Sequence, residues 1–228
     1  MITIGRWSGK LFKQQIRLFD VLEGDIDMVN QEDPRVLRTR QLIRKAFREL
    51  LQTKGFDSIT IKDIAHRATL NRATFYTHYE DKYTLLEEIT EESFHKRIPE
   101  QVENAQEFTA EICNELILMT HRYIVDFYQI CRMDSKSIAT LVDEKIKKML
   151  QQIIECIFLK ENNYNMENRN QTKIMASMTS SAIYGAAYEW LMVGDDNRTD
   201  LLVDIVRPYV MNGLTSNQEY RKMRTTEW

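Results

Sequence analysis

The chain has 228 residues, of which 43% are hydrophobic and 29% are charged, so it can bury a sizeable core and is too long for one bare DNA-binding module. No stretch approaches the ~18 consecutive apolar residues of a membrane span, and the N-terminus lacks the basic, apolar and small-residue regions of a signal peptide. We therefore expect a soluble, cytoplasmic protein with one small part and one larger part.

The formal net charge of −3 conceals a basic segment. Residues 35–82 carry 11 Lys and Arg against 5 Asp and Glu, a balance of +6, whereas residues 1–34 have a balance of −2 and residues 83–228 one of −7. A local excess of basic residues is typical of a nucleic-acid contact, and a solvated basic helix face fits the charge equally well. The residue pattern of the segment has to decide between them.

Glycine and proline are scarce, with seven and three residues, and neither occurs between Pro99 and Gly185. Strands and tight turns need these residues, so the long stretch without them indicates helices. We predict an all-α fold, with a three-helix N-terminal head and a larger helical body.

Residues 1–34 form an N-terminal extension that contains a short amphipathic run. The run has helical spacing at Leu11, Phe12, Gln15, Ile16 and Phe19. One interpretation is an extra helix that packs on the head or contacts DNA through Lys10, Lys13 and Arg17. The other is a loosely ordered extension, since Met28 also supplies a start just ahead of the next element.

From Arg35 the pattern becomes that of a long amphipathic helix. Its apolar residues recur at helical spacing at Leu42, Ile43, Ala46, Phe47, Leu50 and Leu51. Lys54 and Gly55 supply the basic residue and the glycine that commonly end a helix. Thr60 then opens a capping box with Asp63, which predicts a short second helix.

A tight turn at residues 69–71 joins this second helix to a third. Asn71 is a good N-cap for a helix from Arg72 to about Tyr79. The small and apolar residues that would form the shared core are Ile64, Ala65, Leu70 and Phe75. Two short helices joined in this way form a helix-turn-helix, which favours the nucleic-acid interpretation of the basic segment.

The rest of the chain is predicted to form five further helices. Asp81 caps one that runs toward Arg97, where Pro99 ends it. Residues 107–160 have the spacing of two long helices, and residues 171–193 and 199–212 that of a final pair, which Gly213 ends.

Two stretches of this head resemble the signature of the TetR/AcrR family of transcriptional regulators. They are Ser58–Ala68 and Asn71–Lys82, which contain the capping box, a Thr-Phe-Tyr core and the Asp-Lys start of the next helix. The resemblance covers about residues 37–90. It implies a homodimer with a ligand-binding body, which binds a palindromic DNA operator and is released by a small molecule.

One residue departs from the family pattern, since Thr69 stands where the family usually has glycine. A β-branched residue is strained at positive φ, which glycine adopts at little cost. Either the turn differs in geometry, or the strain costs about 1–3 kcal/mol and the surroundings absorb it.

These features divide the chain into an extension at 1–34, a helix-turn-helix DNA-binding domain at 35–82, a ligand-binding and dimerisation domain at 83–214 and a polar tail at 215–228. We predict a repressor. A transcriptional activator or a ligand-independent regulator of the same fold is the alternative.

The N-terminal residues of the third helix are the predicted base readers. Arg72 leads because a guanidinium can donate two hydrogen bonds to guanine, and a phosphate contact is its alternative. Ala73 suits a thymine methyl group, and Thr74 suits either a base or a phosphate. The full predicted set is Arg40, Thr60, Asn71, Arg72, Ala73, Thr74, Tyr76, Thr77, His78 and Lys82.

Several members of this set are predicted to contact phosphates. The family resemblance implies that role for Tyr76 and His78. Lys82 opposes the helix dipole where it stands, and a phosphate bound at that helix N-terminus would remove the penalty. Thr60 and Arg40 are further candidates.

Methionine and aromatic residues recur along the helices of the body. Such a stripe is usually plain core, and as a set it also suits a pocket for an apolar or weakly polar small molecule. The predicted pocket residues are Met119, His121, Tyr123, Phe127, Met149, Ile153, Tyr184 and Tyr188.

The final helical pair is rich in small residues that let another helix approach closely. Two such helices from each subunit would form a four-helix bundle across a two-fold axis, as the family does. The predicted interface residues are Ala182, Gly185, Ala186, Leu202, Ile205, Val206 and Tyr209.

Cys113, Cys131 and Cys156 lie singly within apolar helical patterns, which favours buried, reduced thiols over a redox sensor. The sequence has no GxSxG, HExxH, Walker A or glycine-rich dinucleotide motif. We therefore expect neither an enzyme nor a protein that needs a metal or cofactor.

Overall fold

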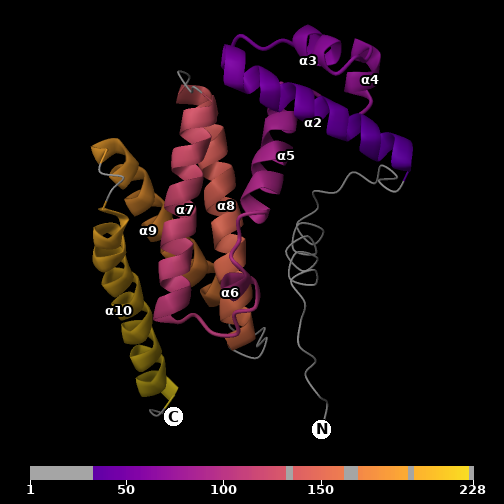
Figure 1. Cartoon of the computed structure of the whole chain (residues 1–228). Coiled ribbons are helices and arrows are strands. Elements are labelled where there is room, and N and C mark those ends of the chain that lie inside the picture. The colour runs from indigo at the N-terminus through magenta and orange to yellow at the C-terminus, as the bar shows by residue number, and fades with distance from the viewer. Residues whose placement is uncertain (1–32, 132–135, 162–168, 195–197, 226–228) are drawn as a thin grey trace. The chain divides into compact units, whose positions relative to one another are not determined.

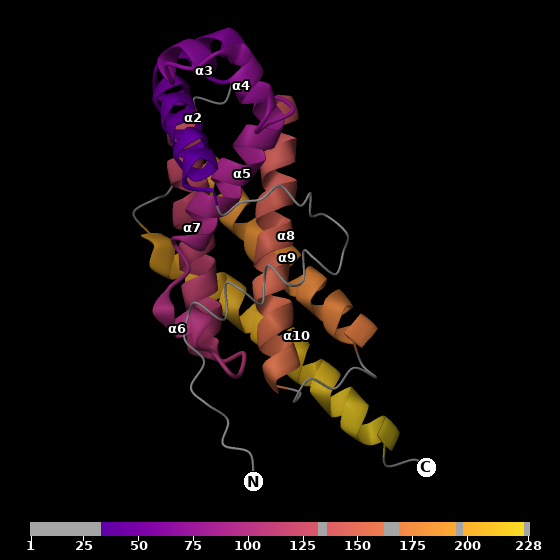
Figure 2. The ribbon, with the colours of Figure 1, turned by 90° about the vertical axis from the view of Figure 1, so that its right-hand side faces the viewer.

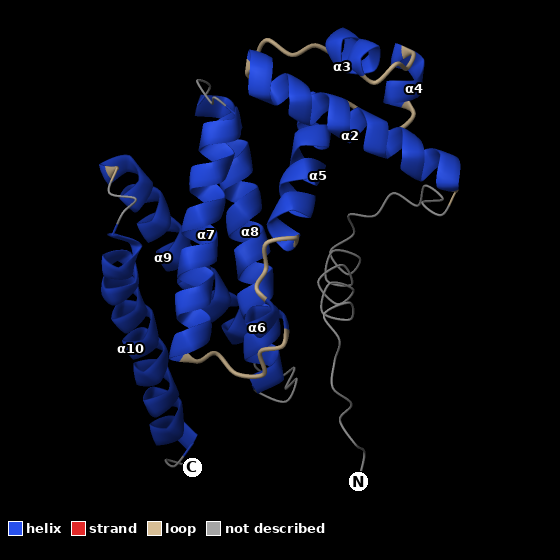
Figure 3. Cartoon of the chain, viewed as in Figure 1, coloured by secondary structure: helices blue, strands red, loops and turns tan. Residues whose placement is uncertain are grey.

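The computed structural model describes residues 33–131, 136–161, 169–194 and 198–225. These residues form nine α-helices and no strand, which confirms the all-α prediction (Figures 1 and 3). The expectations for Lys10, Lys13, Arg17 and the rest of residues 1–32 fall outside the described residues.

The first three described helices form the predicted helix-turn-helix head. Helix α2 is Pro34–Lys54, α3 is Ile61–Arg67 and α4 is Arg72–Tyr76. Helices α3 and α4 lie beside α2 (Figures 1 and 2). Helix α4 is shorter than predicted, because the chain tightens into a turn at residues 77–78, where the His78 N–H donates to the carbonyl of Phe75, three residues back, at 2.9 Å.

Helix α5, Lys82–His95, begins at Asp81, whose carboxylate accepts hydrogen bonds from the backbone N–H groups of Tyr83 and Thr84. A short helix that was not predicted, α6, follows at Glu100–Glu103. The two long helices that were predicted next are α7, Ala110–Cys131, and α8, Lys136–Glu161.

The last two helices are α9, Arg169–Val193, and α10, Thr199–Thr225, and they pack against each other. Helix α10 runs through both Pro208 and Gly213, so the predicted helix end at Gly213 is wrong. Gly213 does not adopt the positive φ seen at Gly55 and Gly194. A glycine with helical backbone angles costs only about 1 kcal/mol relative to alanine, and so it need not end a helix.

The chain forms two compact units. Among the described residues, one unit contains α2 to α5 together with residues 125–146, and the other contains residues 97–124 and the chain from residue 147 onward. The predicted boundary between residues 82 and 83 falls at the first turn of α5, whereas in the structure all of α5 belongs with the head. Ion pairs join α5 to α2 within this unit.

None of the helices in the described ranges combines the length and the apolar character needed to cross a lipid bilayer.

Candidate nucleic-acid interface

A buried core fixes the orientation of the short helix α4. Phe75 has no exposed surface, and its ring centroid lies 5.7 Å from that of the buried Tyr79. Ile64 and Ala65 of α3 are buried in the same head. Because Phe75 anchors one face of α4, the opposite face is held toward solvent.

The exposed face of α4 contains most of the predicted base readers. Arg72, Ala73 and Thr77 are exposed, and the side chain of Tyr76 is 58% exposed. Thr74 is half-buried. The structure therefore brings these residues together on one surface that runs along α4, and Arg72 and Ala73 lie at its start, where an HTH helix presents side chains to base edges.

Two predicted contact residues are already engaged in local hydrogen bonds. The Asn71 side chain caps α4, since its Oδ1 accepts a hydrogen bond from the Ala73 N–H at 3.0 Å. The Thr77 hydroxyl donates to the Thr74 carbonyl at 2.8 Å. Both side chains are exposed, so a DNA contact would add to these bonds or replace them.

The turn between α3 and α4 has the backbone geometry that glycine favours. Thr69 has φ of 58°. Its N–H donates to the His66 carbonyl at 3.1 Å, and the Leu70 N–H donates to the Ala65 carbonyl at 2.9 Å. This pair of bonds is a Schellman motif with Thr69 at its left-handed position. Of the two expectations for this turn, the structure has the strained one.

Lys82 has partners other than a phosphate. Its Nζ donates to the carbonyls of Phe56, Asp57 and Ile59 at 3.0, 3.2 and 2.9 Å, and it lies 4.4 Å from the centroid of the Phe56 ring. An ammonium has three donors, and these three carbonyls use all of them. Lys82 therefore holds the loop between α2 and α3, whereas the sequence predicted a phosphate contact.

The pKa of Lys82 lies below its ordinary value because burial lowers it more than Asp57 raises it. Asp57 therefore offsets only part of the cost of moving the ammonium out of water.

Arg40, like Lys82, has partners within its own chain. It forms an ion pair with Glu88 of α5, and its guanidinium lies 5.1 Å from the centroid of the Tyr79 ring. Burial lowers the pKa of Arg40, but Glu88 and Tyr79 outweigh this, so the pKa lies above its ordinary value. The charge of Arg40 is therefore compensated within the head.

Arg40 belongs to a ladder of charges between α2 and α5. Arg44 pairs with Glu88 at 2.5 Å, and Arg48 pairs with Glu92 at 2.9 Å. Tyr79 donates a hydrogen bond from its hydroxyl to Glu88 at 3.1 Å. Glu88 and Glu92 lie outside residues 35–82, so the balance of +6 overstates the free positive charge of the head.

Thr60 forms the predicted capping box. Its hydroxyl accepts a hydrogen bond from the Asp63 N–H at 3.2 Å, and the Asp63 carboxylate accepts one from the Thr60 N–H at 3.0 Å. Hydrogen bonds from Thr60 and from Lys54 lower the pKa of Asp63 to about 2. A carboxylate that is ionised at neutral pH beside Thr60 disfavours a phosphate at that position.

His78 is half-buried at the end of the α4 region. Burial is the main cause that lowers its pKa below the ordinary value, and the neighbouring Arg40 lowers it further. This lowering favours the neutral imidazole, whose N–H would make the proposed contact with a phosphate oxygen.

The predicted pocket residues are mainly core. Seven of the eight are buried, and Tyr188 is half-buried. The rings of Tyr184 and Tyr188 stack at a centroid distance of 6.2 Å, with Lys147 Nζ 4.7 Å from the Tyr184 centroid. Phe127 falls in the unit that contains the head, and the other seven fall in the other unit.

The predicted interface residues divide into two groups. Leu202 and Val206 are buried within the chain itself, whereas Ile205 and Tyr209 are 58% and 75% exposed. Ala182, Gly185 and Ala186 are half-buried.

Four large residues on α9 share this exposed character and were missed, namely Ile174, Met178, Met192 and Val193. Two of them, Ile174 and Met178, are 60% and 67% exposed and lie at helical spacing with Gly185. Their i, i+4 and i+11 pattern was the available signal.

The thiols of Cys113 and Cys156 are buried, as predicted, while the side chain of Cys131 falls outside the described part. Burial raises the pKa of Cys113 to about 12 and also raises that of Cys156. A thiol must ionise to act as a nucleophile, so neither is activated. The described residues contain no group of three or more His, Cys, Asp or Glu positioned for a metal ion.

Residues 43–89 match the model of the family described as bacterial regulatory proteins, tetR family. An uncharacterised HTH-type transcriptional regulator from Bacillus subtilis strain 168, YxbF, is 41% identical over 71 residues, which are 31% of this chain and 19% of that protein. The HTH-type dhaKLM operon transcriptional activator DhaS of Lactococcus lactis strain IL1403 is 33% identical over 94 residues, which are 40% of this chain and 47% of that protein. The matched regions thus span less than half the length of these relatives.

Two solved structures are similar at 17% sequence identity. The dihydroxyacetone kinase operon activator DhaS aligns over 78% of this chain and 95% of its own, with a TM-score of 0.46. The fatty acid degradation regulator FadR of Bacillus halodurans aligns over 77% and 96%, with a TM-score of 0.47. The family match and the named HTH-type relatives coincide with the helix-turn-helix of α3 and α4, so this part of the chain is similar to the DNA-binding domain of the TetR family of transcriptional regulators.

Proposed function

We propose that this regulator acts in the cytoplasm as a homodimer, binds a palindromic operator through α4 and releases it when a small molecule binds the helical body. The observation that carries the proposal is the surface of α4, where Arg72, Ala73 and Tyr76 are exposed above the buried Phe75. A short helix held by its core face and exposed on the other is suited to the major groove.

Arg72 is the proposed base reader, since its guanidinium is exposed and suited to guanine O6 and N7. Ala73 beside it would contact a thymine methyl group, and Thr74 a base or a phosphate. Tyr76, Thr77 and His78 would contact phosphates, which fix the register of the protein without reading the sequence. Asn71 contributes by capping α4.

A second copy of the chain is the proposed occupant of the exposed face of α9 and α10. Ile174, Met178, Ile205 and Tyr209 are large, apolar or aromatic, and more than half exposed. A Cβ built on Gly185 meets no atom within 4 Å apart from its immediate neighbours and the adjacent backbone of its own helix. Glycine within a helix costs roughly 1 kcal/mol relative to alanine, and close approach of a partner helix would account for its use.

Dimerisation would also supply specificity, because one short helix reads few bases whereas two heads about 34–36 Å apart read a palindrome. A small molecule that binds better to the conformation with the wrong spacing would release the DNA, with about 1.4 kcal/mol of differential binding changing operator affinity tenfold. The effector would be apolar or weakly polar, since the proposed pocket residues Met119, Tyr123, Met149 and Ile153 are mostly apolar.

Activation is the second candidate function, because one relative, DhaS, is named as an operon activator. Repression and activation differ in where the operator lies relative to a promoter. The same head and the same dimer serve both.

The test is selection of bound sequences from random duplex DNA with the purified full chain. We expect an enriched palindrome. Arg72→Ala should change which bases are selected, whereas Tyr76→Phe should lower the affinity and leave the selected bases unchanged. The absence of any enriched palindrome would contradict the proposed function. A reporter carrying the selected operator within or upstream of a promoter then distinguishes repressor from activator.

A further inference from the structure

Helix α2 has two basic faces, one whose residues form ion pairs and one whose residues are exposed. Arg40, Arg44 and Arg48 recur at a spacing of four residues and pair with the glutamates of α5. Arg38 and Lys45 lie on another face, are exposed, and have no ion-pair partner among the described residues. The structure therefore separates the basic residues that hold the head together from those that are free.

The free residues belong to a ridge of α2 that we define as Arg38, Leu42, Lys45 and Glu49. Steps of four, three and four residues keep these positions on one side of a helix. Glu49 accepts a hydrogen bond from Nε of Arg67, the last residue of α3, at 2.7 Å. The ridge is therefore on the side of α2 that meets the end of α3, just before the turn that leads to α4.

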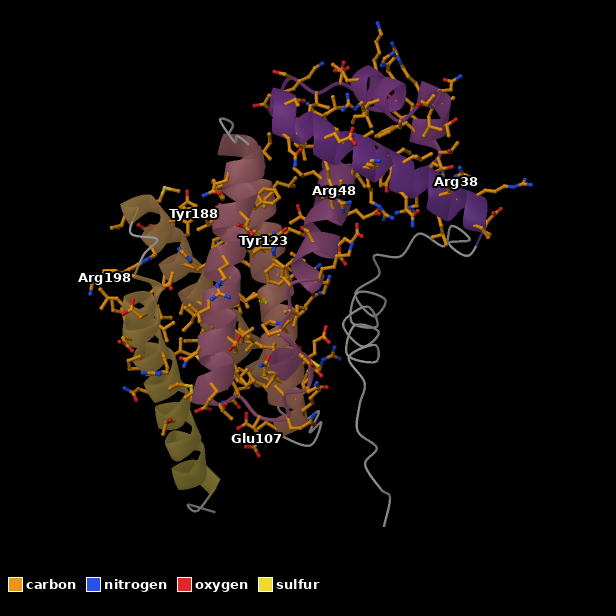
Figure 4. All side chains as sticks on the ribbon, in the orientation of Figure 1. Arg38, Arg48, Glu107, Tyr123, Tyr188 and Arg198 are labelled. Atoms are coloured by element: carbon orange, nitrogen blue, oxygen red, sulfur yellow. The ribbon has the colours of Figure 1, made fainter. Side chains whose placement is uncertain are left out.

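Figure 4 shows the two faces by their labelled residues. Arg38 extends from α2 into solvent, whereas Arg48 lies where α2 meets α5. Arg38 and Lys45 are seven residues apart, so they lie about 10 Å apart along the helix axis.

We propose that Arg38 and Lys45 form a second DNA contact, which grips the phosphodiester backbone beside the groove that α4 enters. This rests on the proposed function. The ridge replaces the contact predicted at Arg40, two residues away, because one face of the helix is occupied by Glu88 and the other is open. Two exposed cations on this side of α2 would attract the anionic backbone of a duplex. Phosphate contacts do not read the base sequence, so α4 would still determine it.

The salt dependence of binding measures this contact. Each phosphate contact on B-DNA adds about 0.9 to the slope of log affinity against log salt concentration. A dimer would make each contact twice, so Arg38→Ala should reduce the slope by about 1.8. Between 50 and 200 mM salt this corresponds to about 12-fold less loss of affinity for the variant than for the wild type.

The experiment compares Arg38→Ala and Lys45→Ala with two controls on the same operator and on a random duplex. Arg122→Ala removes an exposed cation of α7, outside the head, and Arg44→Ala removes a cation that is paired with Glu88. We expect both ridge variants to lower the slope on both duplexes, with unchanged base preference. Both controls should keep the wild-type slope.

The outcomes are separable. Ridge variants with the wild-type slope would overturn the inference while leaving the proposed function intact. A fall in slope that Arg122→Ala shares would also overturn it, because net charge alone would then explain the effect. A chain that binds no duplex overturns the proposed function and the inference together. If the ridge variants bind DNA as the wild type does but lose binding to an acidic protein, the ridge contacts that protein, and the inference is refuted.

Discussion

Replacing Thr69 with glycine should stabilise the head, because Thr69 occupies the left-handed position of the turn between α3 and α4 with φ of 58°. A left-handed conformation costs an L-residue roughly 1–2 kcal/mol, and the branched Cβ of threonine adds to the crowding. Glycine removes this strain and costs about 0.4–1 kcal/mol through the greater freedom of the unfolded chain. The net gain is about 1 kcal/mol.

Thermal unfolding of the full chain, at one fixed protein concentration, measures the gain. For a protein of this size about 1 kcal/mol raises Tm by roughly 2–4 °C. The concentration is fixed because a dimer makes Tm depend on it. The backbone hydrogen bonds of the turn do not involve the Thr69 side chain, so operator affinity should stay close to that of the wild type.

Thr53→Gly is the matched control, since Thr53 lies in the last turn of α2, where φ is not positive. The same change there should destabilise the chain by a few tenths of a kcal/mol or more, through lost helix propensity and lost hydrogen bonds. A Thr69→Gly variant that melts at or below the wild-type Tm would refute the argument that the turn stores strain.

Three further changes test other parts of the structure. Lys82→Met keeps the aliphatic stem and removes the donors to three carbonyls, so it should lower the free energy of unfolding by about 1–2 kcal/mol in urea titrations. It should leave the salt slope of DNA binding unchanged, and a flatter slope with wild-type stability would restore the phosphate role. Asp63 has a folded pKa of about 2 against an ordinary 3.8, so its stabilisation is present above pH 4 and is lost as the pH falls toward 2. Asp63→Asn should remove that part of the acid dependence of Tm, and an unchanged acid profile would argue against it. Tyr209→Asp should convert a dimer to monomers in sedimentation experiments, because the exposed ring lies on the proposed interface, and a wild type that is monomeric at micromolar concentration would argue against the dimer.

Local sequence signals predicted the helix starts of the head well. Asp81, Asn71 and Thr60 each cap the helix that follows, and Thr60 forms the predicted reciprocal capping box with Asp63. Each of these interactions joins residues at most three positions apart. The signal for helix ends was weaker, since α10 passes through Gly213 and the short α6 was missed.

The apolar periodicity predicted the long helices correctly. It did not predict which of their apolar residues are buried within the chain and which are exposed. On α10 the sequence alone placed Leu202, Ile205, Val206 and Tyr209 together at the interface. The structure buries Leu202 and Val206 within the chain and exposes Ile205 and Tyr209. Both pairs are apolar or aromatic at helical spacing, so only the packing of α10 against α9 separates core from surface.

By itself the sequence determined the resemblance of the head to the TetR family, the all-α class and the position of the helix-turn-helix, because these depend on caps, turns and apolar spacing within a few residues. Only the tertiary structure decided which basic residues are free. Arg40 meets Glu88, which is 48 residues away, and Lys82 meets carbonyls 23 to 26 residues away. Charge alone cannot distinguish a cation that binds DNA from one that binds its own chain, since phosphates, carboxylates and backbone carbonyls can all compensate the same positive charge. The fold makes that choice by bringing α5 against one face of α2 and leaving Arg38 exposed on another.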